Sequence, residues 1–286
     1  NAVIENEGEY GNVEFFGAMG QSVSSIDLRI FASRWKFGFA VYEETKRGPS
    51  HGLQFFDASG RAIHKIYLRP ESDAAFFADL VKRHTAADQS ASVVVSAVEA
   101  PPPPKPDDRI DVAGLRDAWR KMTDSHQFFG LLRQFDVART QALRLAGSDF
   151  TRPLARTVAE HLLHAAQKAA LPFMTFVGNA GIIQINTSVA KKVAAMGPWI
   201  NILDPGFDFH LRTDAIEEAW LVRKPTSDGI VTSIEIYDAS GEQIVLFVGK
   251  RKPGIPESEA WRALAESLPS LASTTPTMTT EKELRS

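Results

Sequence analysis

The segment LQFFDASGRAIHKIYLRP, residues 53–70, decides the fold, because its pattern returns as IEIYDASGEQIVLFVGKR at residues 234–251. Each copy places two apolar runs around the same turn, Asp-Ala-Ser-Gly, which is typical of a β-hairpin. Upstream, IDLR at 26–29 corresponds to FHLR at 209–212, and a helical pattern follows each hairpin. This collinear match of strand, turn, strand and helix predicts two copies of one structural unit.

The duplicated unit predicts an α+β fold, with a large antiparallel sheet and flanking helices in each copy. Between the copies, the run PPPPKPDD at 101–108 favours a stiff, extended spacer. Because the chain begins with Asn1 rather than Met, we expect further residues before it. The expected boundaries are an N-terminal module truncated at its start (1–84), a Pro-rich linker (85–110), a central helical segment (111–171), a C-terminal module (172–268) and a disordered tail (269–286).

Composition excludes several classes of function. The 286 residues include no cysteine, which excludes disulfides, iron–sulfur clusters, thiolate ligands and cysteine nucleophiles. A net charge of −3 gives no general attraction to nucleic acid. No apolar run is long enough to span a membrane, and no secretory signal is present. The sequence also lacks a Walker loop, a dinucleotide fingerprint and a nucleophile elbow.

A central stretch, DSHQFFGLLRQFDVARTQALRLAG at residues 124–147, predicts two consecutive helices. Thr123, Asp124 or Ser125 is expected to cap the first helix, and Asp136 the second, which Gly147 ends. His126 then falls in a first helical turn, where the helix dipole favours a neutral imidazole with a free lone pair.

A neutral imidazole in an apolar wall suits an axial ligand to haem iron, and Gly130 would leave space beside it for a flat ligand. The alternative is a partly exposed structural histidine.

The other histidines have structural interpretations. His161 and His164 lie three residues apart on a predicted helix, but without further ligands nearby we expect them to face solvent. His64 alternates with apolar residues and is expected to be partly buried. His210 follows a strand pattern and could line a cleft.

The motifs above, with FVGNAGIIQI at 176–185, MGPWINILDPGFDFHLR at 196–212 and WLVRKPTSDGIVTSIEIYD at 220–238, extend over nearly the whole chain. Together they resemble the cytoplasmic haemin-handling proteins of bacterial haem-uptake systems, the HemS/HmuS type. The resemblance implies a tandem duplication with two large antiparallel sheets and helices around them. It also implies haem b, as ligand or substrate, in a cleft between the halves.

The resemblance assigns roles to individual residues. His126 corresponds to the iron ligand, and Arg29 with Phe31 to the distal pair on the opposite face of the haem. From the strand pattern alone, Arg29 faces away from Leu28 and could equally be exposed to solvent. The remaining haem-contacting positions are Arg139, Phe176, Lys224 and Arg251, of which the last two lie in basic clusters that suit propionates.

Three positions depart from the family pattern. A second histidine that some members carry three residues after the ligand is Phe129 here. The position of an aromatic hydroxyl offered to a propionate corresponds to Val245. The histidine often found after IIQI is Asn186.

Two functional classes remain open, with a third as the structural alternative. The chain could carry imported haem to another protein for iron acquisition, or it could be a haem-degrading enzyme with haem oxygenase-like activity, in which Arg29 would be catalytic. A haem-free interaction module is the third. Expected partners are haem and, with it, a haem importer, a haem acceptor or a reductase. The expected location is the cytoplasm, and the sequence leaves monomer and dimer open.

Overall fold

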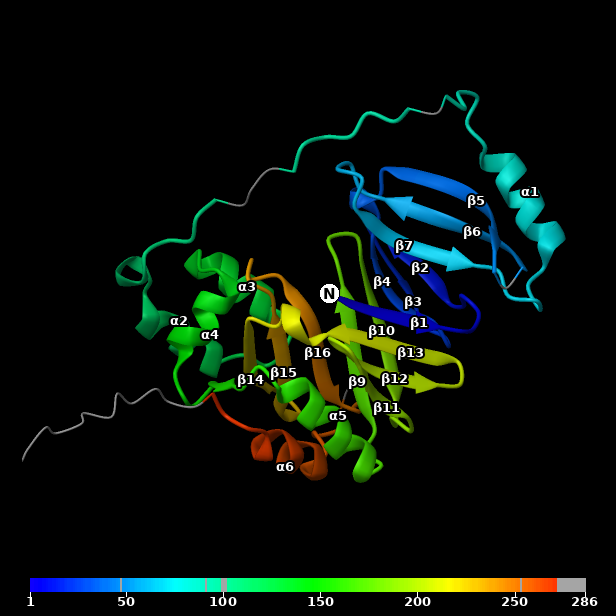
Figure 1. Ribbon diagram of the computed structural model, residues 1–286. Helices are drawn as coiled ribbons and strands as arrows, with labels where there is room; N and C mark the ends of the chain where they lie inside the picture. Colours follow the sequence, from blue (N-terminus) through cyan, green and yellow to red (C-terminus); the bar gives the residue numbers. More distant parts are fainter. Residues whose placement is uncertain (47, 91, 99–101, 253, 272–286) are drawn as a thin grey trace, which may run out of the picture.

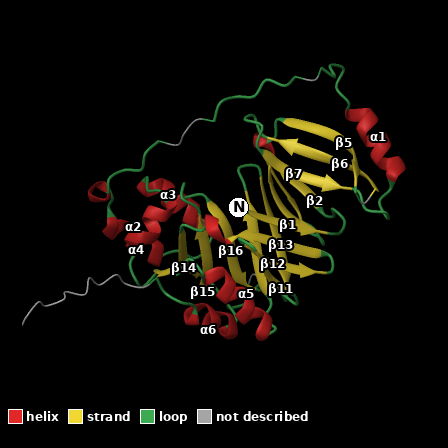
Figure 2. Ribbon diagram, viewed as in Figure 1, coloured by secondary structure: helices red, strands yellow, loops and turns green. Residues whose placement is uncertain are grey.

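The computed structural model describes residues 1–46, 48–90, 92–98, 102–252 and 254–271 (Figure 1). Strands make up most of both halves, whereas helices gather in the middle of the chain and at its end (Figure 2). The first half, residues 1–84, contains β1 (Ala2–Asn6), β2 (Val13–Phe16), β3 (Met19–Ser22), β4 (Asp27–Phe31), β5 (Phe37–Thr45), β6 (Gly48–Phe56), β7 (Ala62–Tyr67) and α1 (Ala74–His84).

The centre of the chain supplies α2 (Val112–Arg120), α3 (Gln127–Phe135), α4 (Arg139–Ala146), β8 (Thr151–Leu154) and α5 (Val158–Lys168). The second half, residues 172–268, contains β9 (Phe173–Gly178), β10 (Ile182–Ser188), β11 (Val193–Met196), β12 (Trp199–Asp204), β13 (Phe207–Arg212), β14 (Glu218–Thr226), β15 (Gly229–Tyr237), β16 (Gln243–Gly249) and α6 (Glu259–Ser267). The sequence of six strands and one α-helix from β2 to α1 is therefore repeated from β11 to α6.

The two Asp-Ala-Ser-Gly turns have the same geometry. Asp57 accepts hydrogen bonds from the backbone N–H groups of Ser59 and Arg61 at 2.8 and 2.9 Å. Asp238 accepts the corresponding bonds at 2.9 and 3.1 Å. The glycine of each turn has a positive φ, 82° and 78°, a conformation that glycine adopts without steric cost. The turns confirm the α+β tandem duplication expected from the sequence.

Strands of the first half pair with strands of the second half. β10 of the second half pairs with β4 of the first, and β1 of the first half pairs with β13 of the second. One result is a nine-stranded antiparallel sheet in the order β2-β3-β4-β10-β9-β16-β15-β14-β8. The other sheets are β1-β13-β12-β11 and β5-β6-β7. Backbone hydrogen bonds therefore join the modules that the sequence pattern separates at residues 84 and 172.

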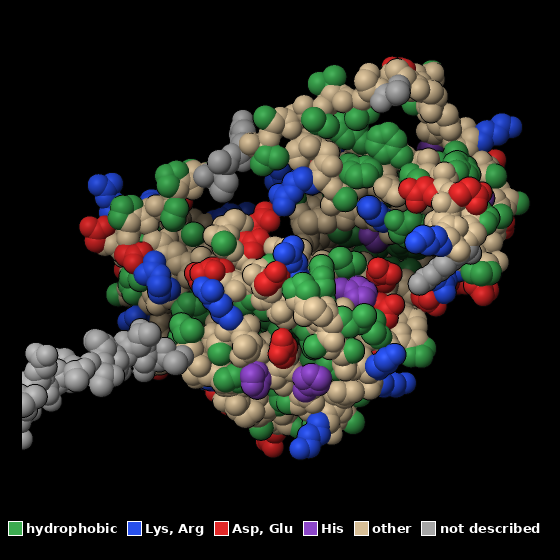
Figure 3. All heavy atoms as spheres, viewed as in Figure 1, with side chains coloured by type: hydrophobic (Ala, Val, Ile, Leu, Met, Phe, Trp, Pro, Cys, Tyr) green, Lys and Arg blue, Asp and Glu red, His purple; other side chains and the backbone are tan. Residues whose placement is uncertain are grey.

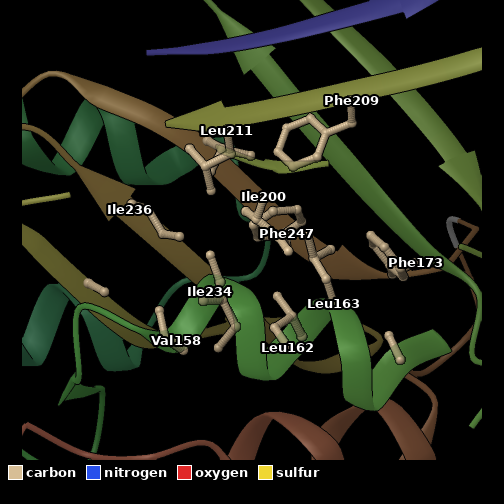
Figure 4. Close-up of a cluster of buried hydrophobic side chains, with 14 of the residues drawn as sticks. Val158, Leu162, Leu163, Phe173, Ile200, Phe209, Leu211, Ile234, Ile236 and Phe247 are labelled. Atoms are coloured by element: carbon tan, nitrogen blue, oxygen red, sulfur yellow. The ribbon is translucent and has the colours of Figure 1, made fainter. Parts of the chain in front are cut away.

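The largest core lies between α5 and the sheets of the second half. Val158, Leu162 and Leu163 of α5 point toward Ile234 and neighbouring apolar side chains of the sheets (Figure 4). A second cluster joins the central helices to β14 and β15, and Trp119 Nε1 donates to the backbone oxygen of Arg223 at 2.9 Å. A smaller cluster joins Ile26, Leu28 and Ile63 of the first half to Ile182 on β10 of the second half.

The described linker residues from 85 to 106 contain neither helix nor strand. These described residues lie above the body of the molecule, between α1 and the central helices (Figure 1). The expected disorder of the tail is wrong for residues 269–271, because Ser270 bridges to Leu154 and the carbonyl of Pro269 accepts from Ala155 at 2.9 Å. Residues 272–286 lie outside the described part.

The expected cap at Asp136 is also wrong. Asp136 ends α3 in the left-handed conformation, with φ 48°, and α4 begins after Ala138. Aspartate tolerates this conformation better than most residues, so the same preference that suggested a cap serves a helix end. Gly147 ends α4 as expected. In the described residues no helix is both long and apolar enough to cross a membrane.

Two glycines give opposite predictions for stability. Gly130 lies inside α3, and a Cβ there would meet nothing within 4 Å, so Gly130→Ala should raise the free energy of unfolding by about 1 kcal/mol. At Gly181, a Cβ would come within 2.7 Å of two side-chain carbons of Ile63, so Gly181→Ala should lower it by about 1–3 kcal/mol. Urea unfolding measures both, and equal effects of the two substitutions would contradict this packing.

Candidate functional site

A cavity of about 2610 Å³ lies between the first half, the second half and the start of α3. The space-filling view shows the surface hollowed between the two parts of the molecule, with Lys and Arg side chains around the hollow (Figure 3). All seven residues assigned by the family resemblance line this one cavity. They are Arg29, Phe31, His126, Arg139, Phe176, Lys224 and Arg251.

His126 stands directly before α3, with 90% of its side chain exposed. Asp124 orients it, because one carboxylate oxygen lies 2.8 Å from the His126 backbone nitrogen and 2.7 Å from Nδ1. The first of these bonds, from the backbone N–H, is the main cause that lowers the pKa of Asp124. With Nδ1 bonded to a carboxylate, the remaining ring nitrogen, Nε2, is the one that can bind a metal.

The segment that carries His126 is tied to the second half. The backbone N–H of Ser227, in the turn between β14 and β15, donates to the carbonyl of Thr123 at 2.8 Å. Asp228, in the same turn, lies 3.6 Å from the guanidinium of Arg251. Arg251 and the His126 segment are therefore both held by the turn between β14 and β15.

Arg29 and Phe31 lie on the face of β4 opposite the buried Leu28, as the alternation predicted. Arg29 Nη1 donates to the backbone oxygen of Leu28 at 2.9 Å and pairs with Asp27. Because β4 is hydrogen-bonded to β3 and β10, both strands fix the position of Arg29.

Lys224 and Arg139 form the basic part of the wall. Lys224 Nζ lies 4.8 Å from the centre of the Phe128 ring, and the Arg139 guanidinium lies 5.3 Å from the centres of Phe128 and Phe129. Behind them, Glu235 is fully buried and pairs with both. The cation–π contacts with Phe128 and Phe129 hold Lys224 and Arg139 on the cavity side, and the ion pairs with Glu235 hold them from behind.

The remaining wall is largely apolar. Phe176 of β9 and Leu246 of β16 are paired across the sheet, and both line the cavity. Flat aromatic surfaces, grouped cations and the exposed imidazole of His126 together suit a planar, mostly apolar molecule that carries acidic groups and a metal ion.

Several expected residues lie elsewhere. His161 and His164 are exposed on α5, as predicted, and His161 Nδ1 lies 2.9 Å from the carbonyl oxygen of Thr157. His210 does not line the cavity, and its Nδ1 lies 2.7 Å from the side-chain oxygen of Asn201 on β12. In the described residues no cluster of three or more His, Asp or Glu could hold a metal ion.

Three further expectations need correction or placement. Gly130 does not line the cavity; it borders a separate pocket of about 390 Å³. Val245 is buried in the core on the opposite face of its sheet, so it cannot stand where a hydroxyl would meet a ligand. Asn186 bonds to Asn6 at 3.3 Å and does not line the cavity.

Sequence reasoning missed the carboxylates Asp124 and Glu235. The sequence pattern predicts only a helix cap at Asp124 and only a position in the repeated hairpin for Glu235. A signal existed for Glu235, since a charged residue amid the apolar residues of a central strand requires buried partners. His64, expected to be partly buried, lines the cavity with its Nε2 2.8 Å from the hydroxyl of Tyr10.

Together, the fold and the cavity define a class: a duplicated α+β protein with a cavity lined by aromatic rings, a group of cations and the exposed imidazole of His126. The chain belongs to the family described as "Haemin-degrading HemS.ChuX domain", which matches residues 1–84 and 136–268. This confirms the family inferred from the sequence motifs.

Individual relatives agree with the family assignment. The hemin transport protein HmuS of Yersinia pestis is 38% identical over 265 residues, which cover 91% of this chain and 75% of HmuS. The crystal structure of holo-PhuS, a heme-binding protein from Pseudomonas aeruginosa, superposes with a TM-score of 0.91 at 44% identity, covering 94% of this chain and 79% of PhuS. ChuS, described as a heme degrading enzyme of Escherichia coli O157:H7, gives 0.87 at 36% identity, covering 94% and 78%.

His64 gives a prediction about pH. Burial lowers the pKa of His64 from 6.5 to about 4, so the unfolded chain takes up this proton at higher pH than the folded protein does. The contribution of neutral His64 is therefore complete above about pH 6.5 and is lost as the pH falls toward 4. We expect this group to lower the free energy of unfolding by up to about 3 kcal/mol over that range. Urea unfolding at several pH values should show a smaller loss in His64→Gln than in the wild type, because the variant lacks this group while the carboxylates titrate in both.

Proposed function

We propose that this protein binds haem in the cavity between its halves, with His126 as the ligand to iron, and passes it on for iron acquisition. The observation that carries the proposal is the convergence of the seven residues on one cavity. They come from six places in the chain, from β4 to the segment after β16. The family and its haem-binding relatives supply the identity of the ligand.

The residues present fit haem. Nε2 of His126 is available for iron, since Nδ1 is bonded to Asp124. Phe31 and Phe176 provide flat apolar surface, while Lys224, Arg139 and Arg251 provide positive charge for two propionates. Charge-assisted hydrogen bonds to carboxylates are stronger than neutral ones, so these cations would contribute most to orientation of the ring.

A carrier must release its ligand without unfolding. The halves cannot swing apart as rigid bodies, because the pairings of β4 with β10 and of β1 with β13 join them. His126, in contrast, is exposed and lies just outside a helix. We infer that release proceeds by movement of the His126 segment, and that the Pro-rich linker serves to span the two halves.

Haem degradation is the second candidate, and Arg29 favours it. Its guanidinium lines the same cavity as His126 but comes from the other half of the molecule, so it could face the opposite side of a bound haem. ChuS is described as a heme oxygenase. Electrons would have to come from a separate reductase, since the sequence contains no nicotinamide or flavin fingerprint. A haem importer or acceptor, and a cytoplasmic location, belong to the carrier proposal.

The first test concerns the iron ligand. His126→Ala should change the absorption spectrum of the haem complex and weaken haem binding by at least about tenfold, because it removes a metal–ligand bond. His161→Ala is the matched control, since His161 is exposed and remote from the cavity, and it should change neither property. Spectral titration measures both. A wild-type spectrum and affinity in His126→Ala would exclude His126 as ligand.

A second test separates carrier from enzyme. For a carrier, intact haem should move to an acceptor apoprotein faster than it dissociates spontaneously, and Arg29→Ala should still transfer it. A single-turnover assay with a reductant, and with catalase to remove peroxide, examines degradation. A linear tetrapyrrole formed by the wild type and by Arg34→Ala, but not by haem-loaded Arg29→Ala, would overturn the carrier proposal in favour of the enzyme. Arg34 is exposed and does not line the cavity.

A further inference from the structure

A buried carboxylate stands behind the basic wall of the cavity. Glu235 lies on β15, is fully buried and does not line the cavity itself. One oxygen accepts from Lys224 and from the hydroxyl of Ser233 at 3.0 Å. The other accepts from Arg139 at 2.8 Å, from Gln243 at 3.1 Å and from the hydroxyl of Tyr237. Both oxygens are therefore fully used by side chains from α4, β14, β15 and β16.

The two cations stand between Glu235 and the cavity. Lys224 and Arg139 both line it, and both lie against Phe128. One carboxylate opposes two cations, so the group carries one unmatched positive charge. Tyr237 and Gln243 bring no compensating anion. A buried excess charge is costly unless a counter-charge approaches, and the cavity is the open side from which an anion can come.

The charges of the three groups depend on one another. Burial lowers the pKa of Lys224, and repulsion by Arg139 lowers it further, while Glu235 acts against both. For Glu235, burial alone would raise the pKa, but Arg139 and Lys224 together hold it well below its ordinary range. Glu235 therefore stays ionised, and Lys224 depends on it to keep its proton. The charged or titratable groups that face Lys224 are Glu235 and Arg139.

We propose that Glu235 is the positioning residue of an anion-binding wall: it holds Lys224 and Arg139 at the cavity and keeps Lys224 charged, so that the wall can bind one ligand carboxylate. This inference rests on the proposed function, because it makes that carboxylate a propionate of the bound porphyrin. Glu235 does not touch the ligand and acts only through the two cations.

A purely structural ion pair would affect stability, whereas the proposed role changes how ligand binding depends on pH. Glu235→Gln keeps the shape and one acceptor oxygen but removes the charge and replaces the other oxygen by an amide group that donates. Lys224 should then lose its proton at lower pH, by at least about one unit. Porphyrin affinity should accordingly begin to fall at lower pH in Glu235→Gln than in the wild type.

The experiment measures affinity from pH 6 to 10 for haem, for iron-free protoporphyrin IX and for its uncharged dimethyl ester. The earlier fall in Glu235→Gln is expected for both carboxylate ligands and not for the ester. The double variant Glu235→Gln/Lys224→Met should bind weakly without that pH dependence, because the titrating group is gone. Glu266→Gln is the matched control, since Glu266 pairs with Arg223 outside the cavity lining, and its profile should follow the wild type.

Two results would overturn the inference: a wild-type profile in Glu235→Gln, or an early fall that persists in the double variant. If Glu235→Gln does not fold, Glu235→Asp replaces it in the experiment. This variant keeps the negative charge but moves it away from Lys224 and Arg139 by the length of one methylene group. It is expected to show a smaller shift in the same direction, and no shift would contradict the role.

Failure of the proposed function remains distinguishable. If the wild type does not bind haem, that function is wrong. The Lys224 proton can still be followed by NMR in the ligand-free protein. A lower Lys224 pKa in Glu235→Gln would support the positioning role, and an unchanged one would refute it.

Discussion

The pairing of β4 with β10 is the interaction on which the rest of the molecule depends. It aligns Ile30 with Ile182 and Arg29 with Ile183, and so joins the first half to the second within a single sheet. Without it, Arg29 would have no fixed relation to the residues on β9, β14 and β16. The cavity exists because two copies of one unit share a sheet, and its two sides inherit their positions from the two copies.

The sequence predicted the architecture well wherever the information was local or repeated. The Asp57 and Asp238 turns mark the duplication because side-chain bonds within a turn depend on neighbouring residues. The pairing of strands between the two halves could not be predicted, since the alternating pattern of β4 fits any antiparallel partner. Family motifs brought the cavity residues together, whereas spacing alone misplaced Gly130, whose side of α3 is set by tertiary packing.

The four cations assigned to the site share one arrangement. Arg29 pairs with Asp27, Arg251 lies near Asp228, and Lys224 and Arg139 share Glu235. A carboxylate therefore holds each long side chain before any ligand arrives. Preorganisation of this kind lowers the entropy cost of binding, since fewer rotamers are lost when the ligand enters. It also limits the positive charge that the empty cavity presents.

The pairing of β1 with β13 has a consequence for the order of synthesis. Ala2 pairs with Leu211, so β1 cannot pair with β13 until the ribosome has added more than 200 further residues. At roughly 5–20 residues per second, this takes about 10–40 s. During that interval the backbone groups of β1 must remain in water or be shielded by another chain. The nascent protein is thus exposed to strand-mediated aggregation until its second half leaves the ribosome.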